Sequence, residues 1–388
     1  MARRFASREL VEVSITVCVG CYSLRYLDGG AYMWVFLNWA LGLRSIGCRV
    51  IWLDSVLPDT STEKIGRDAT ELKERLHRFG IETDLAVIYR DGDRPPLPSG
   101  AYLDLDAAAE ADLFINLGYD LDARVIRRFR HSAFVDIDPG LTQTWVALGQ
   151  LELVQHDLYF TYGETVGQPG SKIPDCGIFW RYTSPPVFLP EWPVAADGPS
   201  AYTTVTDWWG DWIEINGVCL DNSKRAAFLE YVKLPRLTPY ALELAVPLSR
   251  CEDVTNDLDL LRTNGWSTRH VREVTRTPED FRSYVQSSRG EFSCMKTGYG
   301  RLKTSWIGER ALGYLSSGKP AVIQCTGKSG FLPHAEGLFR FRSVDEAAAA
   351  LSAIERDYEK HSRAARALAE EYFDSKRIAA NVLEQALP

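Results

Sequence analysis

The chain lacks a long apolar run, an excess of positive charge and a regular cysteine pattern, and each absence excludes a class of protein. The longest apolar stretch, residues 31–43, is interrupted by Asn38 and is too short to span a bilayer. Lys and Arg number 44 against 52 Asp and Glu, a formal net charge of −8. We therefore expect no large nucleic-acid interface, because such interfaces neutralise phosphates with many cations.

Signals for export, disulfides and metal binding are missing as well. The N-terminal Met1-Ala2-Arg3-Arg4 is basic, but no apolar segment follows it, so we expect no signal peptide. The eight cysteines are scattered singly except for Cys18 and Cys21, whose spacing is not completed by a second pair or a histidine cluster. We predict reduced cysteines, no metal site and a cytoplasmic location.

Two common nucleotide-binding motifs also fail. Gly327-Lys328-Ser329 resembles the end of a P-loop, but the first glycine of that motif would fall at Val322. No G-x-G-x-x-G sequence follows a predicted strand. P-loop nucleotide hydrolysis and dinucleotide binding are therefore not predicted.

What the chain does have is an alternation of apolar strands and amphipathic helices. With 388 residues it is long enough for two domains. A strand, a glycine turn, a helix and a second strand follow one another over residues 11–53, the order of a parallel βαβ unit. We predict an α/β protein with two Rossmann-like doubly wound domains facing across a cleft. The predicted boundaries are 1–165 for the first domain, 166–200 for a Pro- and Gly-rich linker, 201–370 for the second domain and 371–388 for a C-terminal helix.

The most informative segment, residues 296–341, predicts an anion site. Lys296, Arg301 and Lys303 precede Thr304-Ser305, which we interpret as the N-cap of a helix that also carries Arg310. Thr304-Ser305 alone would be explained by capping. The cations favour a bound anion, because the helix dipole disfavours positive charge at a helix start.

Carboxylates and glycines complete the set of candidate site residues. Asp138 follows a predicted strand and faces the expected cleft, where it is a candidate base, although an Asx-type turn before Pro139-Gly140 would also explain it. Glu309 either holds a ribose or sugar hydroxyl or forms a surface pair with Arg310. Gly29-Gly30 either admits a ligand close to the backbone or makes a tight turn.

These residues carry a resemblance to a known family. The 296–341 segment, the tail around residues 357–374 and the opening pattern Gly29-Gly30 … Gly42 … Gly47 resemble the bacterial, nucleotide-sugar-dependent glycosyltransferases of the GT-B fold. The resemblance implies that Lys296, Thr304, Ser305 and Arg310 hold the donor diphosphate, and that Thr326 and Gly327 flank the donor sugar. It also implies that the C-terminal helix crosses back to the first domain. One departure is clear: the E-x7-E carboxylates of the retaining branch would fall at Ser305 and Gly313.

The resemblance implies a metal-independent hexosyltransferase that uses no cofactor. Its partners would be a nucleoside diphosphate sugar, for example a UDP-sugar, and an unidentified acceptor. Asp138 and Glu309 would be the catalytic carboxyl groups, and the stereochemistry stays open. The alternatives are a nucleotide-sugar epimerase on the same fold and a non-enzymatic two-domain protein that closes on a small ligand.

Overall fold

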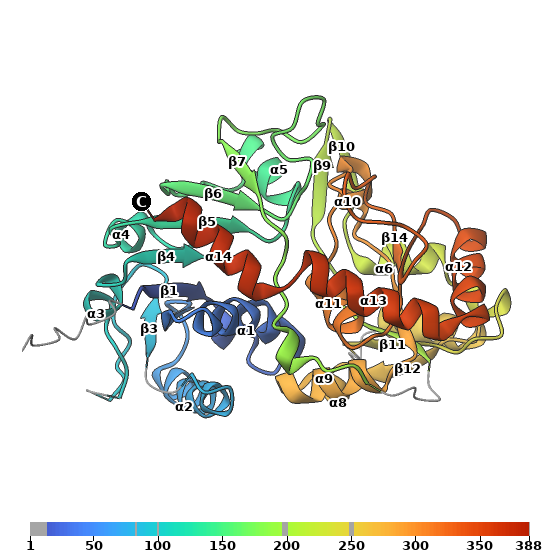
Figure 1. Cartoon of the computed structure of the whole chain (residues 1–388), viewed down its shortest axis with the longest axis horizontal. Coiled ribbons are helices and arrows are strands. Elements are labelled where there is room, and N and C mark those ends of the chain that lie inside the picture. Colours follow the sequence, from blue (N-terminus) through green and yellow to red (C-terminus); the bar gives the residue numbers. More distant parts are fainter. Residues whose placement is uncertain (1–13, 82–83, 99–100, 196–200, 248–251, 388) are drawn as a thin grey trace, which may run out of the picture.

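The computed structural model describes residues 14–81, 84–98, 101–195, 201–247 and 252–387, so Met1-Ala2-Arg3-Arg4 lies outside the described residues. Two α/β halves lie side by side, each built on a parallel sheet with helices on its faces (Figure 1). The predicted fold class of two Rossmann-like doubly wound domains is thus confirmed.

The first sheet has seven parallel strands within the described residues. In spatial order they are β3 (Leu85–Tyr89), β2 (Arg49–Val56), β1 (Thr16–Cys21), β4 (Leu113–Asn116), β5 (Ser132–Asp136), β6 (Leu158–Thr161) and β7 (Trp180–Tyr182). The connecting helices are η1 (Ser23–Tyr26), α1 (Gly30–Ser45), α2 (Thr62–Arg78), α3 (Leu105–Ala109), α4 (Ala123–Ile126) and α5 (Leu141–Ala147). The edge strand β7 lies inside the 166–200 segment, which the sequence indicates to be a linker, and it pairs with β6.

The second sheet has six parallel strands within the described residues. In spatial order they are β12 (Ser267–His270), β11 (Leu242–Val246), β8 (Tyr202–Val205), β13 (Gly290–Ser293), β14 (Ala321–Gln324) and β15 (Leu338–Phe341). The helices of this half are α6 (Lys224–Glu230), η3 (Leu234–Arg236), α7 (Glu252–Thr263), α8 (Arg272–Thr275), α9 (Pro278–Ser287), α10 (Thr297–Leu302), α11 (Glu309–Ser316), α12 (Val344–Arg356) and α13 (Tyr358–Tyr372).

A β-hairpin interrupts the second domain between β8 and α6. Its strands, β9 (Trp212–Ile215) and β10 (Val218–Asp221), are antiparallel. Asn216 and Gly217 connect them, with φ of 53° and 76°. Both residues are left-handed, as a two-residue type I′ turn requires.

The strand orders place a topological switch point in each sheet. In the first sheet the order in which successive strands are added reverses between β1 and β4, and in the second sheet between β8 and β13. Ligands of doubly wound sheets bind outside the carboxyl ends of the strands at this point. The loops that follow β1, β4, β5, β8 and β13 are therefore where a site is expected.

The C-terminal helix connects the two domains. The chain leaves α13 and continues into α14 (Ser375–Ala386), which lies along α1 of the first domain (Figure 1). Val187, which precedes η2 (Leu189–Glu191), forms two backbone hydrogen bonds beside α14. Its N–H donates to Phe373 O at 2.7 Å, and its carbonyl oxygen accepts from the Ser375 N–H at 3.0 Å. Because this helix covers α1, most of α1 is buried.

The start of α1 packs directly on the second domain. The Trp34 indole N–H donates to Pro278 O at 2.9 Å. A Cβ added at Gly30 would lie 2.0 Å from the carbonyl oxygen of Thr277. The space beside Gly30 is therefore filled by backbone of the second domain, which cannot yield as a flexible side chain would.

We predict that Gly30→Ala lowers the thermal midpoint of unfolding, because the added methyl group forces α1 away from α9. Overpacking of this kind typically costs about 1–3 kcal/mol. Gly66→Ala is the matched control, since Gly66 lies within α2 and a Cβ there meets no atom within 4 Å. Alanine in an exposed helix is expected to stabilise by about 0.5–1 kcal/mol. Equal midpoints for the two variants by differential scanning calorimetry would contradict the tight packing at Gly30.

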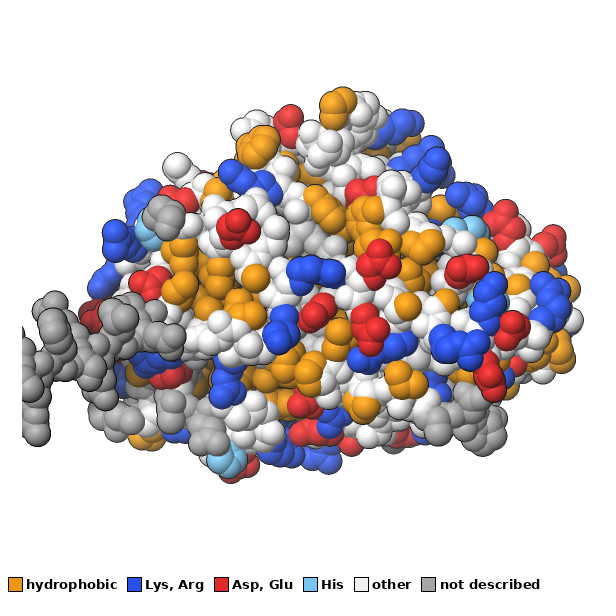
Figure 2. Space-filling view, viewed as in Figure 1, with side chains coloured by type: hydrophobic (Ala, Val, Ile, Leu, Met, Phe, Trp, Pro, Cys, Tyr) orange, Lys and Arg blue, Asp and Glu red, His pale blue; other side chains and the backbone are white. Residues whose placement is uncertain are grey.

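The surface carries both signs of charge. Basic and acidic side chains alternate over both domains on the face in Figure 2. Within the described residues, every helix is too short or too polar to cross a bilayer.

Candidate functional site

The loop after β5 presents Asp138 through a buried carboxylate, Asp136. One Asp136 oxygen accepts from the Asp138 N–H at 3.1 Å and from the Thr142 hydroxyl at 2.7 Å. The other accepts from Gln143 Nε2 and from the Thr161 hydroxyl, both at 2.8 Å. Burial raises the pKa of Asp136 to about 6, while these three side-chain donors favour its ionised form. Asp136 thus fixes the backbone from which Asp138 projects.

Asp138 itself faces the second domain. The hydroxyl of Tyr299, on α10, donates to Asp138 Oδ1 at 2.6 Å. Burial raises the pKa of Tyr119 to about 12, and the negative charge of Asp138 contributes to that rise. Tyr22 and Tyr32 lie close enough to have their pKa values raised in the same way, first by burial and then also by Asp138. The structure therefore surrounds Asp138 with phenols from both domains.

Glu309 belongs to the second domain, whereas Asp138 belongs to the first. It is the first residue of α11. Burial raises its pKa to about 8, and the negative charges of Asp138 and Asp136 add to the effect. At neutral pH Glu309 is therefore mostly a neutral carboxylic acid close to Asp138. Paired carboxyl groups whose surroundings differ are a common arrangement for acid–base chemistry.

Arg310 is fixed at the switch point of the second sheet. Its Nε donates to Glu291 Oε1 at 2.9 Å. Its Nη1 donates to Val205 O, at the end of β8, and its Nη2 to the Ser293 hydroxyl, at the end of β13, both at 2.6 Å. The guanidinium is thus held by the protein, and it contributes positive potential at the carboxyl ends of β8 and β13.

A lysine that the sequence did not single out lies beside it. Lys224 Nζ donates to Cys294 O at 2.5 Å. Burial lowers the pKa of Lys224 to about 7, and the positive charges of Arg310 and Lys296 lower it further. Lys224, Lys296 and Arg310 therefore lie near one another at the switch point, where Glu291 pairs with Arg310 and a bound anion would further reduce the repulsion among the cations.

One signal in the sequence could have revealed Lys224. It is the first residue of α6, directly after the N-cap Ser223, whose side chain accepts from the Ala226 N–H. A cation at a helix start is disfavoured by the helix dipole, which is the argument that drew attention to Lys296. Applied to every predicted helix, that argument selects Lys224 as well.

Thr304 and Ser305 do not cap a helix, so that prediction is wrong. The helix begins at Glu309, and its N-cap is Gly308, which lies four residues after Thr304 and three after Ser305. Thr304 Oγ1 accepts from the Trp306 N–H at 3.3 Å, and the Ser305 hydroxyl donates to Lys328 O at 2.8 Å. Ser305 is left-handed, with φ of 56°. Both hydroxyls thus shape an irregular loop.

The same loop contacts Thr326 and Gly327. The Thr326 hydroxyl donates to Trp306 O at 2.7 Å, and a Cβ at Gly327 would lie 2.8 Å from Ser305 Oγ. The structure therefore brings Thr304, Ser305, Thr326 and Gly327 together in two interlocked loops. Their contact with a donor stays a prediction, as does that of Gly29-Gly30 at the start of α1.

Gly313, where the resembled retaining enzymes have a carboxylate, is closed to larger side chains. A Cβ there would lie 2.8 Å from the Trp192 ring. Trp192 is itself buried against Trp34 and Phe281, at ring-centroid distances of 4.8 and 6.0 Å. An acidic side chain at position 313 would therefore clash with Trp192, and this contact requires glycine.

Across the described ranges, three or more His, Cys, Asp or Glu side chains never gather in a way that could hold a metal ion.

Comparison with known proteins places this geometry in a known fold. No family model and no curated protein matches the chain in sequence. Among solved structures, Anabaena Alr3699/HepE in complex with UDP and glucose superposes with a TM-score of 0.57 at 13% identity, over 96% of this chain and 99% of that one. An alpha-glucosyltransferase in complex with UDP and a 13-mer DNA containing a HMU base gives 0.60 at 10%, over 96% and 99%. Sucrose-phosphate synthase from Thermosynechococcus elongatus gives 0.54 at 11%, over 96% and 98%. Identities this low establish the fold alone, and the chain has the GT-B glycosyltransferase fold that its sequence resembles.

Proposed function

We propose that the protein is a glycosyltransferase that moves a hexose-type sugar from a nucleoside diphosphate sugar to an acceptor hydroxyl. The observation that carries the proposal is that basic side chains and carboxyl groups lie near one another where the two domains face each other. Cations lie near one another at the switch point of the second sheet, and Asp138 lies close enough to Glu309 for its charge to help raise the pKa of Glu309. The cations can bind a diphosphate, and the carboxyl groups can accept the proton of an acceptor hydroxyl.

The cations would bind the donor diphosphate. Lys224 and Lys296 supply charge directly, and Arg310 adds positive potential from its fixed position against Glu291. Thr304 and Ser305 shape the adjoining loop, and Thr326 and Gly327 flank the sugar. In this proposal the cations take the role that a metal ion has in other transferases, and they stabilise the leaving diphosphate electrostatically.

The carboxyl groups would serve the transfer step. The acceptor oxygen forms a bond to the anomeric carbon while the bond from that carbon to the diphosphate oxygen breaks. The acceptor hydroxyl proton passes to Asp138, and the nucleoside diphosphate leaves. Tyr299 occupies Asp138 Oδ1, which leaves Oδ2 for the acceptor. Glu309, neutral at pH 7, donates a hydrogen bond to the reacting sugar or to a phosphate oxygen.

A UDP-hexose is the first donor to test. Structural relatives were solved in complex with UDP and with UDP-glucose. The predicted independence from cofactors and metals belongs to the same proposal, and the assays below can be run with and without a chelator.

Calorimetric titration of UDP and UDP-glucose tests the donor site. We expect Lys224→Ala to weaken binding about 10- to 100-fold, because a hydrogen bond to a charged group contributes about 1.5–3 kcal/mol. Lys376→Ala is the matched control, since Lys376 is exposed on α14. Equal affinities for wild type and Lys224→Ala would remove the donor site from this position. If no nucleoside diphosphate binds, or if the donor is converted to an isomer without any acceptor, the transferase proposal fails.

A further inference from the structure

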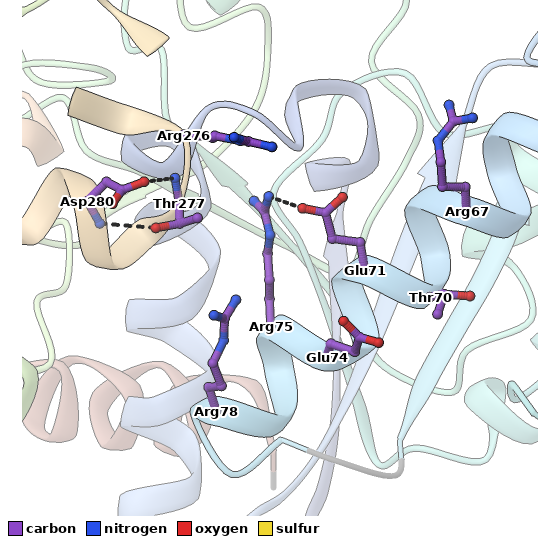
Figure 3. Close-up of a pocket in the computed structure, with 9 residues that line it drawn as sticks. All are labelled: Arg67, Thr70, Glu71, Glu74, Arg75, Arg78, Arg276, Thr277 and Asp280. Atoms are coloured by element: carbon purple, nitrogen blue, oxygen red, sulfur yellow. Dashed lines mark hydrogen bonds and ion pairs between the residues drawn. The ribbon is translucent and has the colours of Figure 1, made fainter. Parts of the chain in front are cut away.

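A polar cavity lies between the two domains. It has a volume of about 750 Å³ and is bounded by α2 of the first domain and by the junction of α8 and α9 of the second (Figure 3). All of its lining residues are charged or threonine: Arg67, Thr70, Glu71, Glu74, Arg75, Arg78, Arg276, Thr277 and Asp280. It shares none of them with the cations or carboxyl groups described above.

Three arginines give this cavity unused donor capacity. Arg75 is 1% exposed; its Nη1 donates to Leu27 O and its Nη2 to Glu71, but its Nε has no partner. The side chain of Arg276 is exposed and forms no hydrogen bond or ion pair with the described residues. Arg78 reaches Glu279 only at 3.4 Å. Because Arg75 Nε is covered by protein, Arg75 supplies mainly positive charge, whereas Arg78 and Arg276 are exposed and can donate to a ligand oxygen.

The guanidinium groups come from both domains. Arg75 and Arg78 project from α2, and Arg276 extends from the α8–α9 junction above Arg75 and Glu71 (Figure 3). Next to Arg276, the Thr277 hydroxyl accepts from the Asp280 N–H at 3.1 Å, which leaves its own proton free to donate to a ligand. Arginine forks and a hydroxyl are the donors that a phosphate group prefers.

The rest of the lining limits what else the ligand can carry. Every lining residue is charged or threonine, so the polar groups that the cavity offers to a ligand are guanidinium, carboxyl and hydroxyl groups. Glu71, Glu74 and Asp280 are acceptors suited to hydroxyl groups. A water molecule takes about 30 Å³ of liquid volume. The cavity volume of about 750 Å³ is many times larger and exceeds what one phosphate group fills.

We propose that this cavity is a binding site for a small phosphorylated sugar, whose phosphate lies among Arg75, Arg78 and Arg276 and whose hydroxyls face the acidic side chains. Such a ligand contacts both domains at once, so its binding favours the arrangement in which α2 and α9 lie together. The site is independent of the proposed transfer reaction.

Calorimetric titration with glucose 6-phosphate, inorganic phosphate and glucose tests the proposal. We expect glucose 6-phosphate to bind more tightly than inorganic phosphate, and glucose alone to give no measurable heat. Arg276→Ala and Arg78→Ala should each weaken glucose 6-phosphate about tenfold or more, because each removes a charge-assisted hydrogen bond. Because the Arg276 side chain is exposed, we expect its replacement to leave the fold intact.

Two controls separate this cavity from other phosphate sites. Arg363→Ala removes an exposed arginine on α13, far from the lining set, and should leave the affinity unchanged. Lys224→Ala disables the proposed donor site and should also leave it unchanged. The proposal is overturned if wild type binds none of the phosphates, if Arg276→Ala and Arg78→Ala bind like wild type, or if Lys224→Ala alone abolishes binding.

Discussion

Asp138→Asn is expected to lower kcat by about 10²–10⁴-fold, the usual contribution of a general base, with little change in donor affinity. The amide keeps the size of the side chain and can still accept the hydrogen bond from Tyr299. It cannot take the acceptor proton. Initial rates at saturating donor and acceptor give kcat, and calorimetry with the nucleoside diphosphate gives the affinity.

Tyr299→Phe distinguishes a catalytic role of Asp138 from a merely structural one. Tyr299 positions the Asp138 carboxylate through a hydrogen bond of 2.6 Å between the domains, so its loss should reduce kcat about tenfold and less than Asp138→Asn does. If Asp138→Asn keeps kcat within about threefold of wild type, the base lies elsewhere.

Much of the fold was predictable because it follows from local rules. A strand, a turn, a helix and a strand over residues 11–53 can close only as a parallel right-handed unit, and β1, α1 and β2 form one. The strand expected near residues 321–325 is β14, Ala321–Gln324. The hairpin of β9 and β10 was missed, although Asn216-Gly217 between apolar segments is a strong hairpin signal.

The site was less predictable because it depends on contacts distant in sequence. Lys303 and Ser305 both have a left-handed backbone conformation, with φ of 56°. Lysine and serine rarely adopt it, so the sequence does not predict it. With these two turns in the loop, α11 begins at Glu309 instead of at Trp306, directly after the predicted N-cap. The bond between Tyr299 and Asp138 joins residues 161 positions apart. Such a pair is determined by how the domains meet, and no local pattern contains it.

Glu309→Ala is expected to lower kcat about 10²–10³-fold, the effect of removing a hydrogen-bond donor aimed at developing charge. Glu309→Gln should keep most of the activity at pH 7, because the amide imitates the neutral carboxylic acid that burial maintains. The similar loss of activity in both variants at pH 7 would instead indicate that the ionised carboxylate is the active form.

The pH dependence of Glu309 then provides the sharper test. Its pKa is about 8 in the folded chain against an ordinary 4.5, so the folded state holds a proton that the unfolded state has lost between these values. Stability therefore falls as pH rises from about 4.5 to about 8, by about 1.4 kcal/mol for each unit of pKa difference, less what solvent screening removes. Activity at saturating donor should fall as pH passes about 8, because ionised Glu309 no longer donates. In Glu309→Gln both slopes should flatten, since the amide does not titrate. A wild-type and a Glu309→Gln profile of the same shape, in both rate and unfolding free energy, would show that Glu309 ionises normally and that its neighbours Asp138 and Asp136 leave its proton unaffected.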